Sequence, residues 1–374
     1  MARKMKDSGI EWIGEIPEGW EVVPVKRLCT MQAGKNLTSE QIAPEGTYPV
    51  YGGNGIRGFF SDYNCDGKFL TVGRQGALCG NVHKINGKVW ATEHAVITTP
   101  SSYTILDFLY FLLIGMDLNQ YVSSTAAQPG LAVGTLLNLK TCYPCSTLEQ
   151  AQISNYLNAK CSEIDVTLSK IRSSIDEYKK LKQAVITQAV TEGTPSMFSS
   201  PHSVKLKYLI SIVSGEAIRN EQLSDFGEYP VYGGGEIIGF CSQYNTSEGS
   251  LIIGRVGARC GCVTHTTCKS WATDNALIVL PTCNAKYMYY VIGHCQLNNL
   301  NTSNAQPLIT STKIKNVVVP YFSDAMQQQE IADYLDAKCA EIDGLIAKKE
   351  QLVKELESYK KSLIYEVVTG KREV

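Results

Sequence analysis

The sequence predicts an α+β chain in which a globular domain and a long helix each occur twice, in the order domain, helix, domain, helix. The main observation is an internal repeat: residues 48–100 align without a gap on residues 229–281, at a constant offset of 181. Both segments contain Tyr-Pro-Val-Tyr-Gly-Gly and Gly-Arg-x-Gly-Ala-x-Cys-Gly. An Ala-Gln-Pro triplet follows at residues 127–129 and 305–307, at an offset of 178. Repetition of this extent indicates duplicated structural units.

The second observation is a pair of long segments in which apolar residues recur at intervals of three and four. Residues 152–161 resemble residues 330–339, and both lie in stretches without proline. The spacing is typical of helices that pack along a seam. Each helix would have about 43 residues and a length of about 65 Å. The seam residues are Ile164, Leu168, Ile171, Ile175 and Tyr178 in the first segment and Ile342, Ile346, Val353, Leu356, Leu363 and Val367 in the second.

Capping and turn residues divide the chain into four parts. Ser146 and Glu149 fit a capping box at the start of the first helix, and Asp324 with Gln327 offers the same geometry for the second. Gly193 ends the first helix. The resulting boundaries are 1–145 for the first domain, 146–193 for the first helix, 194–323 for the second domain, and 324–374 for the second helix and tail.

The two helices differ in one interval. Asp165 precedes Tyr178 by 13 residues, whereas Asp343 precedes Tyr359 by 16 residues. If these pairs are equivalent, the interval predicts a different register in the first helix.

Within each domain, short β-rich runs alternate with glycine-rich turns. Residues 68–72, 82–85 and 95–99 predict strands of an antiparallel sheet. The apolar residues 103–113 and 287–295 predict helices packed on it.

Composition limits the classes of function. The 35 Lys+Arg nearly balance the 36 Asp+Glu, which argues against nucleic-acid binding by bulk electrostatics alone. Residues 1–13 lack the apolar region of a signal peptide, and the apolar window 103–116 is too short to span a bilayer. Thirteen cysteines without an export signal predict reduced thiols and a cytoplasmic location.

Motifs for catalysis or cofactor binding are weak in this sequence. Residues 53–58 match G-x-G-x-x-G, but Glu236 replaces Gly55 in the second copy, so turn glycines are the favoured interpretation. Cys260, Cys262, His265 and Cys268 have short spacing, yet the first copy keeps only one of these ligands, which favours buried thiols over a metal site. We find no P-loop, H-E-x-x-H or G-x-S-x-G. The sequence predicts neither an enzyme nor a cofactor or metal site in this chain.

One basic residue is common to both copies. Arg74 and Arg255 each lie in a Gly-Arg-x-Gly turn, where an Arg and backbone N–H groups suit a phosphate oxygen. The equal alternative is an Arg that braces its own turn.

Several segments together resemble the DNA-specificity (S) subunit of type I restriction-modification systems. They include Asp-Ser-Gly-Ile-Glu-Trp-Ile-Gly-Glu-Ile-Pro at residues 7–17, Tyr-Gly-Gly-Asn-Gly-Ile at residues 51–56, the Ala-Gln-Pro triplets, and Val-Val-Thr-Gly-Lys at residues 367–371. The resemblance covers essentially the whole chain. It implies two target-recognition domains separated by two long antiparallel coiled-coil helices.

The resemblance also implies a function in host defence. Each domain would read one half of a bipartite, asymmetric site in double-stranded DNA. Two methyltransferase (M) subunits would bind S-adenosylmethionine and methylate adenine, and restriction (R) subunits would use ATP and Mg. The alternative is a coiled-coil adaptor whose duplicated domains bind protein or glycan.

Divergence between the copies gives candidates for reading bases, because domains that read different half-sites would keep core positions and vary positions that face the groove. Shared Trp90/Trp271 and Tyr51/Tyr232 are scaffold candidates. The reader candidates are Arg57, Gln75, Asn81 and His83 in the first copy and Glu236, Arg259 and His265 in the second, with the loops 121–128 and 298–306 as further candidates.

The block Tyr-Leu-x-Ala-Lys-Cys-x-Glu-Ile-Asp occurs in both helices and gives candidates for partner docking. A duplicated surface suits two copies of one partner. The alternative is that the block joins each helix to its domain. The candidates are Tyr156, Leu157 and Lys160 in the first helix and Tyr334, Leu335 and Lys338 in the second.

Overall fold

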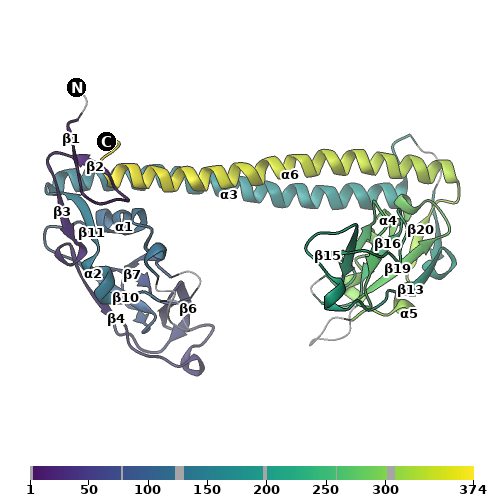
Figure 1. Cartoon of the computed structure of the whole chain (residues 1–374), viewed down its shortest axis with the longest axis horizontal. Coiled ribbons are helices and arrows are strands. Elements are labelled where there is room, and N and C mark those ends of the chain that lie inside the picture. The colour runs from purple at the N-terminus through teal and green to yellow at the C-terminus, as the bar shows by residue number, and fades with distance from the viewer. Residues whose placement is uncertain (1–2, 77–78, 123–129, 197–199, 258, 301–307) are drawn as a thin grey trace. The chain divides into compact units, whose positions relative to one another are not determined.

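The computed structural model describes residues 3–76, 79–122, 130–196, 200–257, 259–300 and 308–374. It divides into two compact units, each with its own core: Met1–Ile171 with Gln351–Val374, and Arg172–Glu350. We call them unit 1 and unit 2. Each unit contains one domain and segments of both long helices, α3 (Thr147–Glu192) and α6 (Ala325–Val368) (Figure 1). The predicted α+β class, the duplication and the two long helices are confirmed.

Unit 1 contains a four-stranded antiparallel sheet and a smaller three-stranded sheet. The larger has the order β4-β10-β7-β8, and the smaller has the order β6-β5-β9 with β5 and β9 parallel. The predicted strands 68–72, 82–85 and 95–99 correspond to three of these elements. The bounds are β4 (Cys29–Ala33), β5 (Tyr48–Gly52), β6 (Gly55–Phe60), β7 (Lys68–Gly73), β8 (Val82–Asn86), β9 (Trp90–Ala91) and β10 (Ala95–Pro100).

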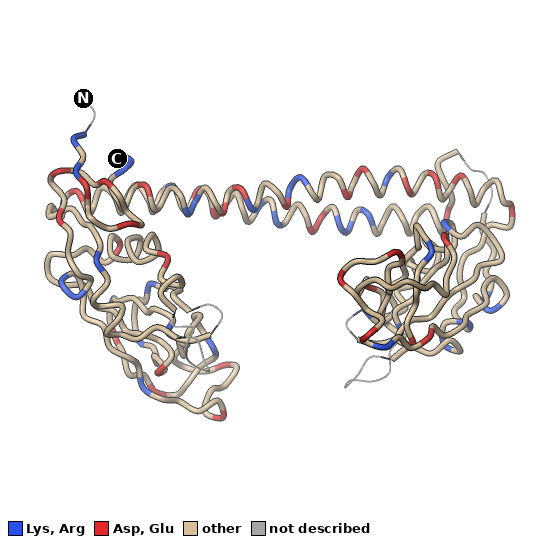
Figure 2. Tube along the Cα trace, viewed as in Figure 1, with Lys and Arg blue, Asp and Glu red and all other residues tan. Residues whose placement is uncertain are grey.

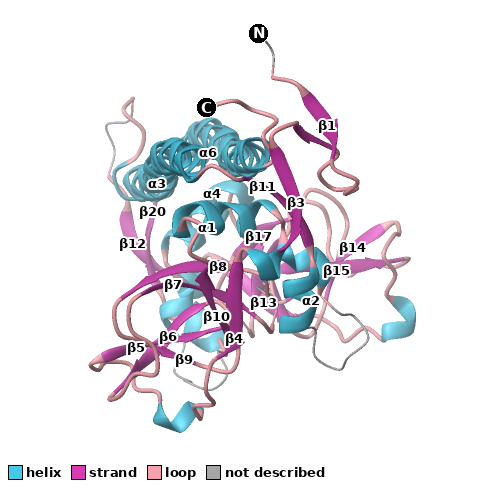
Figure 3. Cartoon of the chain, turned by 90° about the vertical axis from the view of Figure 1, so that its left-hand side faces the viewer, coloured by secondary structure: helices cyan, strands magenta, loops and turns pink. Residues whose placement is uncertain are grey.

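Helix α1 (Leu106–Gly115) lies between the larger sheet and the long helices of unit 1, as Figures 1 and 3 both show. Its Phe108 and Leu112 are fully buried in a core that also contains Leu157 of α3 and Leu363 of α6. Apolar residues occupy most positions of α1, as expected for a helix that is buried on more than one side. The remaining elements are β1 (Met5–Asp7), which pairs with β2 (Glu15–Pro17), β3 (Trp20–Pro24), which pairs with β11 (Lys140–Pro144), and α2 (Val133–Asn138).

Unit 2 repeats this topology. Its sheets have the orders β13-β19-β16-β17, β15-β14-β18 and β12-β20, and α4 (Ala285–His294) takes the place of α1. The parallel pairing of Val50 with Trp90 recurs as that of Val231 with Trp271. The bounds are β12 (His202–Lys205), β13 (Ile210–Ser214), β14 (Tyr229–Gly233), β15 (Glu236–Cys241), β16 (Leu251–Gly254), β17 (Val263–His265), β18 (Trp271–Ala272), β19 (Ala276–Pro281), α5 (Ser311–Lys315) and β20 (Val318–Tyr321). Short 3-10 helices occupy Val25–Arg27, Ser39–Gln41, Leu118–Tyr121, Leu206–Tyr208, Asn220–Gln222 and Leu297–Leu300.

A buried glutamine joins each domain to its long helix. In unit 1, the side chain of Gln150 accepts a hydrogen bond from the Ile105 amide (2.9 Å) and donates to the carbonyl of Pro144 (3.0 Å). In unit 2, Gln328 accepts from the Asn284 amide (3.1 Å) and donates to the carbonyl of Phe322 (2.7 Å). Each glutamine therefore satisfies an amide at the start of the domain helix and a carbonyl at the end of the last strand.

The long helices pack antiparallel within each unit. Asp165 of α3 pairs with Lys360 of α6 (2.7 Å) in unit 1, and Lys182 pairs with Asp343 (2.6 Å) in unit 2. Asp165 precedes Lys182 by the same 17 residues by which Asp343 precedes Lys360. The predicted difference in register is therefore wrong, because Tyr178 and Tyr359 are not equivalent positions.

The first turn of α3 differs in part from the predicted capping box. The Ser146 hydroxyl accepts a hydrogen bond from the Glu149 amide, as expected for an N-cap. The Glu149 carboxylate instead accepts hydrogen bonds from Arg3 and from the Trp20 indole (3.0 Å). These bonds tie the N-terminal segment to the long helix, because Arg3 and Trp20 belong to that segment. They take the carboxylate away from the capping box, since a charged or indole N–H donor is a strong partner for it.

We expect Gly34→Ala to lower the free energy of unfolding by about 3 kcal/mol, because overpacking against fixed backbone is costly. A Cβ at Gly34 would lie 2.2 Å from the Ala91 carbonyl oxygen and 2.4 Å from that of Thr92. Gly134→Ala is the control, because that position in α2 has no atom within 4 Å of the new Cβ. The control should be neutral or stabilising. Denaturant unfolding measures both, and equal effects would contradict the close-approach argument.

Candidate functional site

Two turns, β5–β6 and β7–β8, converge beside the small sheet of unit 1 and bring several predicted reader residues together. The amide of Asn81 donates to the side chain of Asn54 in the β5–β6 turn (2.6 Å). The backbone at Gly53 lies so close to Gln75 that an added Cβ would be 2.7 Å from its carbonyl oxygen. His83 at the start of β8 lies beside Gly55. The G-x-G-x-x-G segment thus forms a turn and the strand β6.

Arg57 belongs to the same hairpin. It is exposed on β6, and its aliphatic portion lies over Gly52, where an added Cβ would be 2.3 Å from its Cδ. In unit 2, Ile238 lies in the same way over Gly233. The hairpin backbone is retained while its exposed side chain changes from cationic to apolar.

The corresponding turns of unit 2 bring Glu236 and Arg259 together. Their side chains form an ion pair and remain 54% and 56% exposed. An added Cβ at Gly235 would lie 3.8 Å from the Cβ of Arg259. The same two turns therefore present an acid–base pair in unit 2 and neutral amides in unit 1.

His265 lies apart from these turns, and its assignment as a base reader stays a prediction. It follows Thr264 on β17, and successive side chains of a strand point to opposite faces. Thr264 takes the position of His83 and donates to the Gly235 carbonyl (3.3 Å). The His265 ring instead packs near Tyr289 of α4, with ring centroids 6.3 Å apart.

Arg74 and Arg255 have equivalent backbone contacts. The amide of Arg74 donates to the His94 carbonyl (2.9 Å), and that of Arg255 donates to the Asn275 carbonyl (3.0 Å). These amides are not available to a phosphate. Within the described residues, Nε of Arg255 is buried without a hydrogen-bond partner. The contacts of these two amides do not test the guanidinium groups, whose role at a phosphate stays a prediction.

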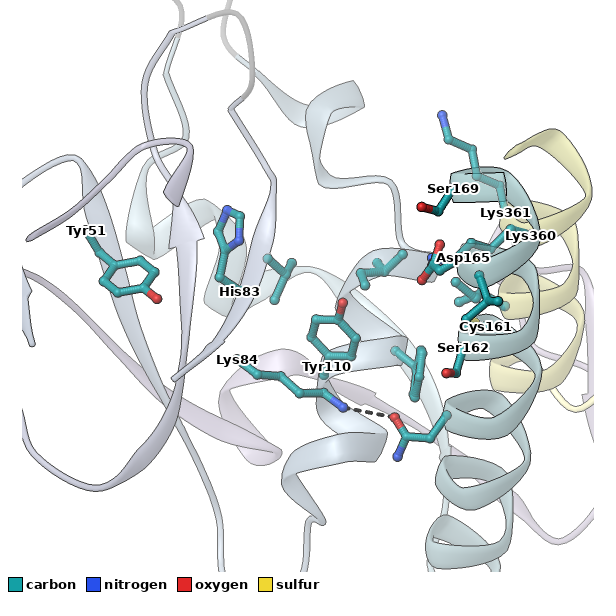
Figure 4. Close-up of a pocket in the computed structure, with 16 residues that line it drawn as sticks. Tyr51, His83, Lys84, Tyr110, Cys161, Ser162, Asp165, Ser169, Lys360 and Lys361 are labelled. Carbon is teal, nitrogen blue, oxygen red and sulfur yellow. Dashed lines mark hydrogen bonds and ion pairs between the residues drawn. The ribbon is translucent and has the colours of Figure 1, made fainter. Parts of the chain in front are cut away.

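A hollow of about 740 Å³ lies between the domain and the long helices of unit 1 (Figure 4). Tyr51 and His83 contribute from the strands, Tyr110 from α1, and Asp165 and Lys360 from the long helices. Burial lowers the pKa of His83, whose Nε2 has no partner among the described residues. Sequence reasoning missed this hollow because its residues are scattered along the chain.

The docking candidates divide into two groups. Leu157 and Leu335 are fully buried in the cores of their own units, so they do not form part of an accessible surface. Tyr156 and Tyr334 are half-buried. The two lysines make equivalent ion pairs with the residue one turn later, Lys160 with Glu163 (2.9 Å) and Lys338 with Glu341 (3.0 Å).

Metal-ligating groups do not gather in the part of the chain that the structure describes: no three His, Cys, Asp or Glu side chains are placed to share an ion. Cys260 is buried as expected, but Cys262 and Cys268 are exposed, so burial was wrong for these two thiols. Most of the candidate loops 121–128 and 298–306 lies outside the described residues. Among the described helices, none is long and apolar enough to cross a membrane.

The geometry defines a duplicated module with a common frame and divergent polar turns, carried on paired helices. The model for the type I restriction modification DNA specificity domain matches residues 17–175 and 202–355. The chain therefore belongs to this family, and each matched segment contains one domain.

A relative from Escherichia coli is in line with this assignment. The specificity subunit of the type I restriction enzyme EcoprrI from Escherichia coli is 40% identical over 161 residues, which are 42% of this chain and 38% of that relative. Both the family and this relative are specificity components, as predicted, and not catalytic ones.

The solved structures show the shared fold. A chain from a study of complex assembly and conformational transition of the type I restriction-modification system has a TM-score of 0.72 at 14% identity, covering 96% of this chain and 99% of that one. The HsdS subunit of Thermoanaerobacter tengcongensis has a TM-score of 0.51 at 14% identity, covering 98% and 100%.

We expect Lys286→Ala to raise the pKa of His265. Burial, and then the charge of Lys286, lower that pKa, while Asp336 raises it. Removing the ammonium group leaves the Asp336 carboxylate free to stabilise the protonated ring. Histidine resonances followed by NMR against pH measure the change. His83, whose pKa is lowered by burial alone, should titrate as before. An unchanged pKa of His265 would contradict the influence of the Lys286 charge on that ring.

Proposed function

We propose that this chain reads a bipartite, asymmetric site in duplex DNA and positions adenine-methyltransferase subunits on it. Residues 1–145 and 194–323 would each read one half-site. The observation that carries the proposal is the pair of domains with one strand register and different side chains at the same two turns. Domains of one frame that differ in exposed side chains suit the reading of two different sequences.

Mixed charge supports a role for partners in holding DNA. Figure 2 shows Lys and Arg interspersed with Asp and Glu along α3 and α6. We propose that two M subunits supply S-adenosylmethionine and much of the contact to phosphates, and that R subunits supply the ATP- and Mg-dependent reaction. Arg74 and Arg255 are proposed to add phosphate contacts from the domains.

The test is to express the chain with the methyltransferase from a neighbouring gene and to sequence the methylated sites. We expect one motif of two half-sites separated by a fixed spacer. Methylation without the chain, or at a single uninterrupted motif, would contradict the proposal.

We expect Arg259→Ala and Arg57→Ala to affect different half-sites. Each loss should weaken binding by about 1–3 kcal/mol and relax base preference in one half-site, if the lost contact is to a base edge. Each variant is the control for the other. Binding to duplexes with single base changes measures the effect. Unchanged affinity and motif for Arg259→Ala would exclude that residue as a reader.

We expect the chain to bind two methyltransferase subunits through the equivalent surfaces around Lys160 and Lys338. Charge reversal at either lysine should remove one subunit, because the two ion-pair settings are alike. Native mass spectrometry at saturating partner should show two copies for the wild type, one for Lys160→Glu or Lys338→Glu, and none for the double variant. A wild-type chain with one copy would contradict the proposal.

We expect the length of the paired helices to set the DNA spacer. One heptad inserted after Arg172 and another after Glu350 keeps the seam in phase and adds about 10.5 Å to each helix. This length corresponds to about three base pairs of B-DNA. The half-site bases should not change. An insertion in α3 alone is the control. It lengthens the interval from Asp165 to Lys182 without lengthening the interval between their partners on α6, and so should destabilise the packing of the two helices. An unchanged spacer in an active double-insertion complex would contradict this expectation.

A further inference from the structure

We propose that one residue of each long helix, Asn158 in α3 and Asp336 in α6, is matched to the polar side chains of its own domain and fixes how that domain is held. These are positioning residues. The functional consequence rests on the proposed function, because the orientation of a domain would determine which spacer it accepts. The contacts themselves do not depend on it.

In unit 1, three side chains from three elements form a closed triangle. The Lys84 ammonium of β8 contacts the Asp107 carboxylate of α1 (2.8 Å) and donates to Oδ1 of Asn158 (3.1 Å). The Nδ2 of Asn158 donates to the other Asp107 oxygen (3.0 Å). Lys84 also lies over the Tyr110 ring, 4.4 Å from its centroid. Figure 4 shows Lys84 reaching past Tyr110 towards α3. We call Lys84, Asp107 and Asn158 the junction triad of unit 1.

In unit 2, the equivalent positions carry different charges. The Lys286 ammonium of α4 contacts the Asp336 carboxylate (2.6 Å), and the Tyr290 hydroxyl donates to its other oxygen (2.7 Å). His265 of β17 lies in the same hollow as Lys286 and Asp336. His265, Lys286 and Asp336 are the junction triad of unit 2.

The offsets of the repeat identify the two triads as equivalent. Lys84 corresponds to His265 at an offset of 181, and Asn158 corresponds to Asp336 at an offset of 178. The sixth residue of each domain helix, Phe111 or Tyr290, also differs, and only the tyrosine supplies a hydroxyl to the long helix. The acid lies on the domain helix in unit 1 and on the long helix in unit 2. Several positions thus differ between the two copies, yet the helix residue has hydrogen-bond partners in each junction.

The buried glutamines provide the contrast. Gln150 and Gln328 bond to backbone groups, which both domains of this chain present at equivalent positions. Asn158 and Asp336 bond instead to side chains of their domains, and these side chains differ between the two domains. Hydrogen bonds to charged groups contribute more than neutral ones and are lost when one partner is wrong. The glutamine therefore accepts either domain, whereas the triad discriminates between them.

An aspartate at the helix position should consequently weaken the junction with the first domain and strengthen the junction with the second. An aspartate at position 158 beside the first domain would remove the donor to Asp107 and place two carboxylates together, which is unfavourable. An asparagine at position 336 would leave Lys286 without its carboxylate. The same aspartate at position 158 would, however, suit a second domain placed on α3.

The first experiment measures the junction in the free full-length chain by hydrogen exchange. Asp336→Asn should speed amide exchange in α4 about tenfold or more, as expected for the loss of a charged hydrogen bond, and leave α1 unchanged. Glu355→Gln is the matched control, because this carboxylate on the same helix accepts a hydrogen bond from Gln351 of that helix. Unchanged exchange in α4, or equal changes in α1 and α4, would overturn the proposal.

The second experiment tests matching. Residues 206–318 replace residues 25–140, so that the second domain lies on α3 as well. Asn158→Asp should slow exchange in the grafted α4 segment of this chimera and speed exchange in α1 of the native chain. An effect of the same sign in both backgrounds would overturn matching. If the chimera does not fold, Asp336→Lys with Lys286→Asp in the native chain decides the matter: the pair should restore the protection that either single variant loses, and failure to restore it would overturn the proposal.

The functional readout is the spacer of methylated sites. With its methyltransferase partner, Asp336→Asn should keep the bases of both half-sites but methylate sites whose spacer is one base pair longer or shorter. A merely destabilised chain would lose methylation at all sites alike, and that result would overturn the positioning role. If the wild type methylates no bipartite site, the proposed function fails, while the exchange experiments still decide whether the junction is matched.

Discussion

The attachment of each domain to its long helix depends on a glutamine that is almost entirely inaccessible to water. Gln150 and Gln328 are 0% and 2% exposed, and each satisfies backbone groups that the fold would otherwise bury without partners. Ile105 has no side-chain cap of its own at the start of α1, so the glutamine oxygen supplies the missing acceptor. The domain helix, the last strand and the long helix are thereby joined at one point.

Because this joint is made to backbone, the rest of the domain is free to diverge. The frame is kept by contacts of the same kind: Asn64 and Asn245 each bond in both directions to the backbone at Ala91 and Ala272. Exposed side chains on that frame differ between the copies, as at Gly55 and Arg57, whose counterparts are Glu236 and Ile238. A fold held by backbone-directed bonds can vary its surface without losing its register.

The glutamine bonds to backbone and the side-chain contacts at the junctions have different roles. Backbone-directed bonds attach both domains in the same way, whereas the side-chain contacts are particular to each domain. Burial alone would disfavour the charge on Asp336, yet bonds from Lys286 and Tyr290 hold its pKa below the ordinary value. The carboxylate thus stays ionised in its partly buried position. Such a contact is strong when its partners match and costly when they do not.

The sequence alone determined the duplication, the two long helices, three strands of the first domain and the resemblance to the family, because these follow from periodicity and from repeated segments. It also located the turns at which Gln75, Asn81, Glu236 and Arg259 lie. It could not assign His265, since a one-residue difference along β17 moves a side chain to the opposite face of the strand. Nor could it find that Leu157 and Leu335 are core residues, or that Tyr178 and Tyr359 are not equivalent. Only the tertiary structure brought Lys84, Asp107 and Asn158 together, because each lies on a different element and their contact depends on how those elements pack.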